Sequence, residues 1–291
     1  MWKKISIITL VLITVLSLTA CTEETEEELG LPSAQEIVDG VIESLDEIRT
    51  YQFDMDMTGG ITADFEGEAY EATVIMDLDG VVDFEDGQMK TEMTVNVEGV
   101  PGVDKTETGI ETYLVGDMIY IMIDTPYMGP EWMKMEMPQG YWGEMSQVES
   151  QIELLEAAQV EVIGSETLEG TDCYVLQLTP DMEQLWQLAM QQPKLPGEEV
   201  SDVAEEFLQE MFSSVSVKQW IAKDTYFLIK AEINMVFASV ELTAEALGLE
   251  VGVSLPTDTS IVLLSYNYNQ PVSIELPPEA EEAVEIPMGP E

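Results

Sequence analysis

The sequence contains no histidine. Without an imidazole, serine–histidine and cysteine–histidine nucleophilic pairs, histidine-ligated zinc and imidazole acid–base catalysis are excluded. A glycosidase-type pair of carboxylates stays formally possible, but acidic residues are so abundant that no particular pair stands out. The sequence therefore predicts a protein that is not an enzyme and that carries no cofactor and no resident metal.

Basic residues are scarce, with 10 lysines and arginines against 58 aspartates and glutamates and a formal net charge of −48. This charge excludes nucleic acid as a partner and repels anionic lipid headgroups. Contact with a membrane would therefore require a lipid anchor or a local apolar surface. The acidity also suits a saline habitat or weak calcium binding, and the sequence leaves these alternatives open.

Only two cysteines are present, Cys21 and Cys173. Cys173 lies in the alternating segment TDCYVLQL and is predicted to pack as a small hydrophobic side chain rather than to act as a nucleophile. An intramolecular disulfide is not expected, because Cys21 is predicted to be modified.

Long hydrophobic runs are absent after Cys21, whereas residues 1–20 have the basic start, apolar stretch and small-residue end of a signal peptide. The tetrad formed by Leu18, Thr19, Ala20 and Cys21 resembles the bacterial lipobox, in which cleavage precedes the cysteine and its thiol carries a diacylglycerol. Cys21 is thus the predicted lipid anchor. An uncleaved N-terminal membrane helix or an ordinary signal peptide is the alternative. Residues 21–32 include five glutamates and are predicted to be an acidic tether.

The folded body is predicted to be a single domain over residues 33–275. Ser33 and Glu36 form a capping box before an apolar stripe that predicts a helix over residues 34–48. From Tyr51 the apolar residues alternate with a period of two, which indicates antiparallel strands through about residue 137. The turns predicted between these strands contain Gly59-Gly60, Asp86-Gly87, Gly116-Asp117 and Gly129-Pro130.

Later segments mix the two periods. Helical stripes are expected near 149–158, 181–191 and 198–212, and strands at 160–167, 173–178, 218–222, 226–238 and 260–268. Residues 276–291 are rich in proline and glutamate and are predicted to be a disordered acidic tail.

One short string resembles functional motifs of other proteins. The segment from Asp54 through Asp56 to Thr58 matches the Asp-x-Asp-x-Thr string of haloacid-dehalogenase-type phosphatases, but that family needs a parallel sheet. It also fits the start of a calcium loop, yet Phe65 stands where a bidentate glutamate is required. Asp54 and Asp56 are therefore interpreted as solvent-facing carboxylates of a strand.

Methionine is unusually frequent, with 18 residues, many of them on the apolar side of predicted strands. Its unbranched, adaptable side chain suits a surface that conforms to acyl chains, although a methionine-filled core is the simpler explanation. Exposed aromatic loops at 126–132 and 139–142 could rim a cavity. The residues predicted to line that cavity are Phe53, Met55, Met57, Met76, Met89, Met93, Met133, Met135, Ile233 and Met235.

The order of these elements resembles the LolA/LppX/LprG lipoprotein superfamily. The resemblance rests on the run from Val217 through Trp220 to Tyr226, which leads into a long strand, and on the segment ETLEGTDCYVLQLTPD at 166–181. It implies an α+β fold, a strongly curved antiparallel half-barrel of about ten or eleven strands with helices packed on its concave face.

The resemblance also implies a function. The chain would be an extracytoplasmic lipoprotein, anchored to the cell membrane or envelope through Cys21, that binds lipid or acyl chains in an apolar cavity as a carrier or chaperone, with an envelope protein as a further partner. A sensor or interaction module that transfers no ligand is the alternative. A calcium-dependent surface protein is a third hypothesis.

Overall fold

The computed structural model describes residues 30–65, 68–99, 106–126, 128–137, 158–181, 212–237, 241–242, 252–254 and 258–286. The chain divides into two units, Met1–Ser33 and Ala34–Glu291, and the folded body is the second unit. The lipobox, Cys21 and most of the predicted tether lie outside the described residues. So do nearly all residues of the helices predicted near 149–158, 181–191 and 198–212.

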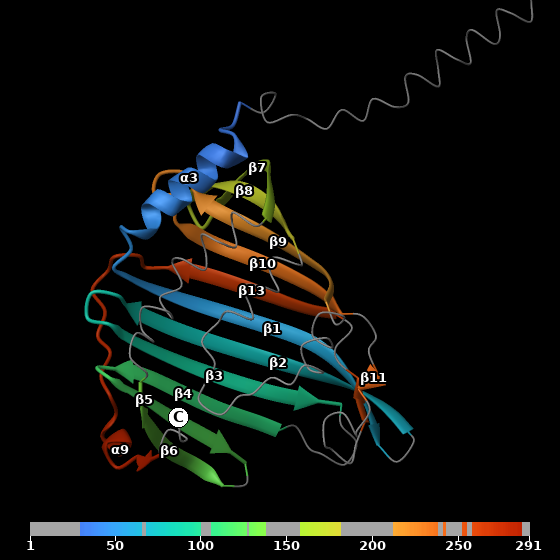
Figure 1. Cartoon of the computed structure of the whole chain (residues 1–291), viewed down its shortest axis with the longest axis vertical. Coiled ribbons are helices and arrows are strands. Elements are labelled where there is room, and N and C mark those ends of the chain that lie inside the picture. The colour runs from blue at the N-terminus through green and yellow to red at the C-terminus, as the bar shows by residue number, and fades with distance from the viewer. Residues whose placement is uncertain are drawn as a thin grey trace, which may run out of the picture. The chain divides into compact units, whose positions relative to one another are not determined.

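Strands dominate the described residues and form one sheet of 14 strands (Figure 1). They are β1 (Thr50–Phe65), β2 (Glu68–Asp83), β3 (Gln88–Glu98), β4 (Thr106–Val115), β5 (Met118–Thr125), β6 (Gly129–Glu136), β7 (Ala158–Leu168), β8 (Thr171–Pro180), β9 (Phe212–Ala222), β10 (Leu228–Phe237), β11 (Glu241–Leu242), β12 (Gly252–Ser254), β13 (Asp258–Tyr266) and β14 (Val284–Glu285). The sheet has more strands than the predicted ten or eleven because it includes three very short ones, β11, β12 and β14, which were not predicted and are only two or three residues long.

The strand order is β14-β6-β5-β4-β3-β2-β1-β13-β10-β9-β8-β7, with β12 joining β1 and β11 to this path. Strand pairs are antiparallel except for β14 with β6. Within the described part of the chain, no pairing joins the outermost strands β14 and β7, so the sheet is open. The predicted antiparallel sheet is therefore confirmed, with β13 and β10 inserted beside β1.

Two predicted turns are confirmed by their backbone. Gly87 follows Asp86 in the β2–β3 turn with φ 62°, and Gly116 precedes Asp117 in the β4–β5 turn with φ 63°. Such positive φ values are accessible to glycine at no steric cost. Gly129 and Pro130 instead open β6.

The turn predicted at Gly59-Gly60 is wrong, because β1 runs through both glycines to Phe65. Gly59 pairs with Val74 of β2 and with Thr259 of β13, and Gly60 pairs with Thr73. Partners on both sides hold the chain extended where the local sequence alone favours a bend. A glycine inside a strand often marks a place where side-chain volume is missing.

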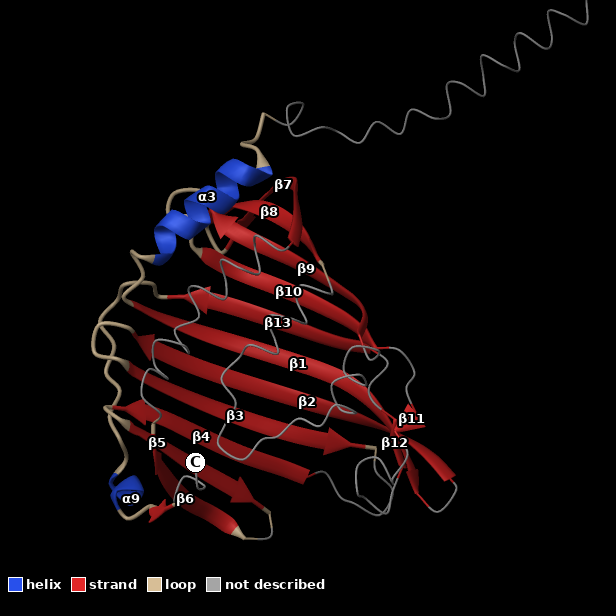
Figure 2. Cartoon of the chain, in the orientation of Figure 1, coloured by secondary structure: helices blue, strands red, loops and turns tan. Residues whose placement is uncertain are grey.

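Two helices occur in the described residues, α3 (Ala34–Leu45) and α9 (Pro278–Glu281), drawn in blue in Figure 2. Helix α3 begins directly after Ser33, as predicted, and buries Ile37 and Val38. At Gly40 a β-carbon would come within 2.6 Å of the Tyr226 ring, so the helix packs closely on the β9–β10 turn. None of the helices within the described ranges is long and apolar enough to cross a bilayer.

The tail predicted to be disordered from residue 276 is ordered through Ile286. Pro278 opens α9, and the buried Ala280 and Ala283 hold this segment against the protein. The backbone N–H of Ile286 then donates to the Lys134 carbonyl at 2.8 Å, and β14 pairs with β6. Burial of two small apolar residues and pairing at an open sheet edge outweigh the acidic composition on which the prediction of disorder was based.

Candidate functional site

The register of the strands sorts their side chains onto two faces of the sheet, because directly opposed residues of antiparallel neighbours share a face. We call one of them the apolar face: it carries Tyr51, Phe53, Met55 and Met57 of β1 and the residues directly opposite them on the neighbouring strands. The other is the polar face: it carries Gln52, Asp54, Asp56 and Thr58 of β1 and the residues directly opposite them on the neighbouring strands.

All ten residues predicted to line a cavity lie on the apolar face. The register places Phe53, Met55, Met57, Met76, Met89, Met93, Met133, Met135, Ile233 and Met235 there. Every one of them is half-buried rather than fully buried. The ten residues therefore share one face of the sheet, and that they line a cavity stays a prediction.

The apolar face is continuous across the sheet. At the level of Met57, one row of apolar side chains crosses eight strands: Val160, Leu178, Val217, Ile233, Ile261, Met57, Met76 and Val95. Neighbouring strands lie about 4.8 Å apart, so this row extends roughly 30 Å. That length accommodates an extended acyl chain.

One end of the apolar face is filled by aromatic rings. The Tyr51 ring lies 5.8 to 5.9 Å from those of Phe53, Phe84 and Tyr268. The Tyr268 hydroxyl donates to the Leu228 carbonyl at 2.5 Å. Burial raises the pKa of Tyr51 and, more strongly, that of Tyr268. Both phenols therefore stay neutral at physiological pH, and the aromatic cluster itself carries no charge.

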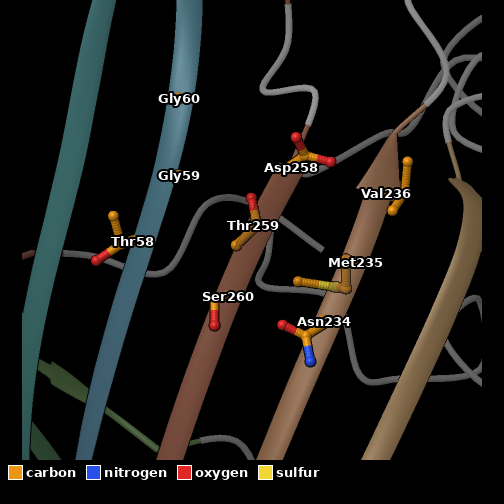
Figure 3. Close-up of a pocket in the computed structure, with 9 residues that line it drawn as sticks. All are labelled: Thr58, Gly59, Gly60, Asn234, Met235, Val236, Asp258, Thr259 and Ser260. Carbon is orange, nitrogen blue, oxygen red and sulfur yellow. The ribbon is translucent and has the colours of Figure 1, made fainter.

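A hollow of about 370 Å³ lies on the polar face, farther along the same strands (Figure 3), because most of its lining side chains are exposed on that face, as those of Thr58 and its ladder partner Ser260 are. It is lined by Thr58, Gly59, Gly60, Asn234, Met235, Val236, Asp258, Thr259 and Ser260. Met235 alone belongs to the predicted cavity residues. Gly59 and Gly60 were not predicted to line a hollow because they were assigned to a turn. Two glycines inside a segment of alternating apolar and polar residues can also mark a place in a strand where side-chain volume is missing.

The polar face carries a ladder of carboxylates on neighbouring strands. Asp79 of β2 pairs with Asp54 of β1 and with Glu92 of β3, and Glu92 pairs in turn with Glu111. Desolvation, a hydrogen bond to Asp54 and the charges of Asp54, Glu92 and Asp56 raise the pKa of Asp79. Asp54 and Asp56 thus lie on a strand as predicted. In the described part of the chain no three acidic or cysteine side chains gather as a metal site.

The Tyr266 hydroxyl donates to Asp54 Oδ1 at 2.7 Å, next to this ladder. Its bond to the carboxylate, helped by partial burial, raises the pKa of Tyr266 to about 12. The phenol therefore remains a neutral donor over the physiological range and supplies a hydrogen bond to one carboxylate of the ladder.

A small core lies on the polar face at β8 and β9. Cys173, Val175 and Trp220 are buried together there, and burial raises the pKa of the Cys173 thiol. The Trp220 indole N–H donates to Glu166 Oε2 at 2.8 Å, and the ammonium groups of Lys218 and Lys230 lie 4.4 and 4.8 Å from the ring centre. Cys173 is thus a packed side chain, as predicted. The cluster is structural rather than part of the apolar face.

The loops predicted to rim a cavity are only partly described. Residue 127 and residues 138–157 lie outside the described ranges. Trp132 belongs to β6, where its partner Met122 places it on the polar face and its ring lies 6.0 Å from that of Tyr113.

A family model described as "Family of unknown function (DUF6612)" matches residues 33–285. A search of curated proteins found no match. Among solved structures, the chain is similar to LprF from Mycobacterium bovis, at 11% identity and a TM-score of 0.44 over 84% of this chain and 96% of that one. It is also similar to the lipoprotein LppX from Mycobacterium tuberculosis, at 14% identity and a TM-score of 0.39 over 84% and 100%.

A domain from Vibrio parahaemolyticus, described as an outer membrane lipoprotein-sorting protein, is similar at 10% identity and a TM-score of 0.25, over 82% of this chain and 95% of that one. One of these neighbours is thus described as a lipoprotein and another as a lipoprotein-sorting protein. The low identities and TM-scores carry no argument about what this chain binds.

Proposed function

The chain belongs to the DUF6612 family of unknown function, and we propose that it is a non-catalytic, extracytoplasmic lipoprotein that binds lipid or acyl chains against its apolar face and carries them. In this proposal the sheet is curved into a half-barrel, helices close its concave side, and the diacylglycerol on Cys21 tethers the protein to a membrane.

One observation carries the proposal: the apolar face is continuous and rich in methionine, and its ten predicted cavity residues are only half-buried. Other side chains of the same face, such as Leu114 and Leu176, are fully buried, so the exposure of the methionines is a local feature of the face. Methionine adapts its shape to variable apolar ligands. Each acyl methylene that such a surface removes from water contributes about 0.8 kcal/mol to binding.

Thermal unfolding of lipid-stripped protein, with and without dioctanoylglycerol, tests this function. Ligand at 100 times its Kd stabilises a folded protein by about 2.7 kcal/mol, so a carrier should show a clear rise in Tm. Native mass spectrometry of the protein as purified should show bound lipid. Absence of both effects contradicts the carrier and favours a sensor or interaction module on the same fold.

A pair of variants on β2 separates ligand binding from general stability. Met76 lies on the apolar face and its neighbour Ile75 on the polar face, and both are half-buried. Met76→Gln should weaken lipid binding by at least about threefold, the loss expected from about one methylene equivalent. Ile75→Gln should leave lipid binding unchanged. Equal losses in both variants would assign the effect to folding rather than to the apolar face.

A further inference from the structure

The polar face carries one row of uncharged polar side chains, which we call the neutral strip. It crosses the neighbouring strands β1, β13, β10, β9, β8 and β7 and consists of Thr58, Ser260, Asn234, Ser216, Thr179 and Gln159. All six residues are exposed.

The row beside the neutral strip, on the same face and the same six strands, is mostly charged. It consists of Asp56, Val262, Glu232, Lys218, Gln177 and Glu161, four of which carry a charge. The neutral strip is therefore a local interruption in the charge of an acidic chain.

The hollow lies at the β1 end of the neutral strip (Figure 3). Thr58, Ser260 and Asn234 belong to both. Within the described part of the chain no hydrogen bond engages these three side chains, so their hydroxyl and amide groups are free to bind a ligand. Asp258, which is exposed, is the one charged residue that lines the hollow.

The ladder along β1 is interrupted at the same place. β1 pairs with β13 as far as Gly59 and with β12 from Thr62 onward, so among the described residues Gly60 has no ladder partner on that side. Gly60 also lacks a side chain, and a β-carbon there would meet no heavy atom within 4 Å. The hollow therefore gives a ligand access to the backbone of β1 as well as to the neutral side chains.

These groups suit an uncharged ligand rich in hydroxyl groups. A serine or threonine hydroxyl and an asparagine amide each offer both a donor and an acceptor, as the hydroxyl groups of a sugar do. An anion would be repelled by Asp258 and by the net charge of −48. A calcium ion, which takes about six to eight oxygen ligands, would find a single carboxylate in the hollow.

We infer that the neutral strip binds a linear, uncharged glycan, with one sugar in the hollow beside Gly60 and the chain running along the strip toward β7. Neighbouring strands lie about 4.8 Å apart, close to the length of one sugar unit in an extended glycan, so successive strands present hydrogen-bonding groups to successive sugars. This site lies on the face opposite the methionines and is independent of the proposed lipid function.

The test titrates the purified protein by calorimetry with two neutral hexasaccharides, chitohexaose and cellohexaose, and with their disaccharides. At least one hexasaccharide should bind, and about tenfold or more tightly than its disaccharide, because it contacts the whole strip whereas the disaccharide covers only the hollow. The inference is overturned if neither hexasaccharide binds, if chain length has no effect, or if the anionic hexamer of galacturonic acid binds more tightly. None of these outcomes bears on lipid binding.

Matched threonine variants show whether the neutral strip is the binding row. Thr94 lies on the same face outside the strip, paired with Asp77 and Gly109. Thr58→Val removes one hydroxyl of the strip and should weaken hexasaccharide binding about two- to tenfold, the effect of one hydrogen bond, whereas Thr94→Val should leave binding unchanged. Gly60→Val places a side chain in the hollow and should weaken binding at least as much as Thr58→Val. Equal losses in the two threonine variants, or full binding by Gly60→Val, would overturn the inference.

Discussion

Phe53 lies over Gly80, the residue opposite it on β2. A β-carbon at position 80 would come within 2.1 Å of the Phe53 ring, which is itself 5.8 Å from the Tyr51 ring. Gly80→Ala should therefore displace Phe53 and disturb the aromatic end of the apolar face. The expected loss of stability is about 1–3 kcal/mol, typical of overpacking, and urea denaturation measures it.

Gly60 supplies the control for this substitution. It also lies within a strand, but a β-carbon there would meet no heavy atom within 4 Å. Gly60→Ala should leave stability unchanged or raise it by about 0.4–1 kcal/mol, because alanine restricts the unfolded chain. An unfolding midpoint of Gly80→Ala equal to that of the native protein would show that Phe53 is not held over Gly80.

At the scale of strands, the carboxylate ladder of β1 to β4 opposes folding. The pKa of Asp79 is raised above its ordinary value of 3.8, so the native state binds this proton more tightly than the unfolded chain does. The resulting destabilisation is present above the raised pKa and disappears as the pH falls toward 3.8. Asp79→Asn should therefore stabilise the protein near neutral pH by about 0.2–1 kcal/mol, the size of one cross-strand pair.

The control for Asp79→Asn is Asp124→Asn, which removes one negative charge from a carboxylate flanked by Gly109 and Pro130 instead of by acids. Chemical denaturation at neutral pH and near pH 4 should show a gain for Asp79→Asn that is lost on acidification. If Asp124→Asn gives the same gain with the same pH dependence, net charge rather than the ladder is responsible.

The strands and the faces of their side chains could be predicted from the sequence, but the order of the strands in the sheet could not. Alternation from Tyr51 onward predicted the strands and placed Met57 and Met76 on the same side, because the period of two alone decides the face. Position within the sheet was not predictable, since the pairing of β1 with β13 joins residues about 200 apart in the chain. Gly59-Gly60 and the C-terminal segment were misassigned for the same reason: long-range pairing overrode local preference.

At the scale of the whole molecule, charge and fold oppose each other. A net charge of −48 makes the compact state repel itself, and the described ion pairs of Lys90, Lys218 and Lys230 are partly exposed and individually weak. Confining these lysines to the polar face keeps the apolar face free of counter-charge, but it leaves the carboxylate excess to be screened by the solvent.

Added salt should therefore stabilise this protein. Raising NaCl from about 0.1 M to 1 M shortens the screening length from about 10 Å to about 3 Å, which weakens repulsion between neighbouring carboxylates. The Tm should rise by at least about 2 °C, a change that corresponds to roughly 1 kcal/mol for a domain of this size. A parallel series in CaCl₂ at equal ionic strength should give the same curve if screening is the cause. A larger rise in calcium would instead indicate bound Ca²⁺, and a Tm that is constant or falls in NaCl would contradict the electrostatic account.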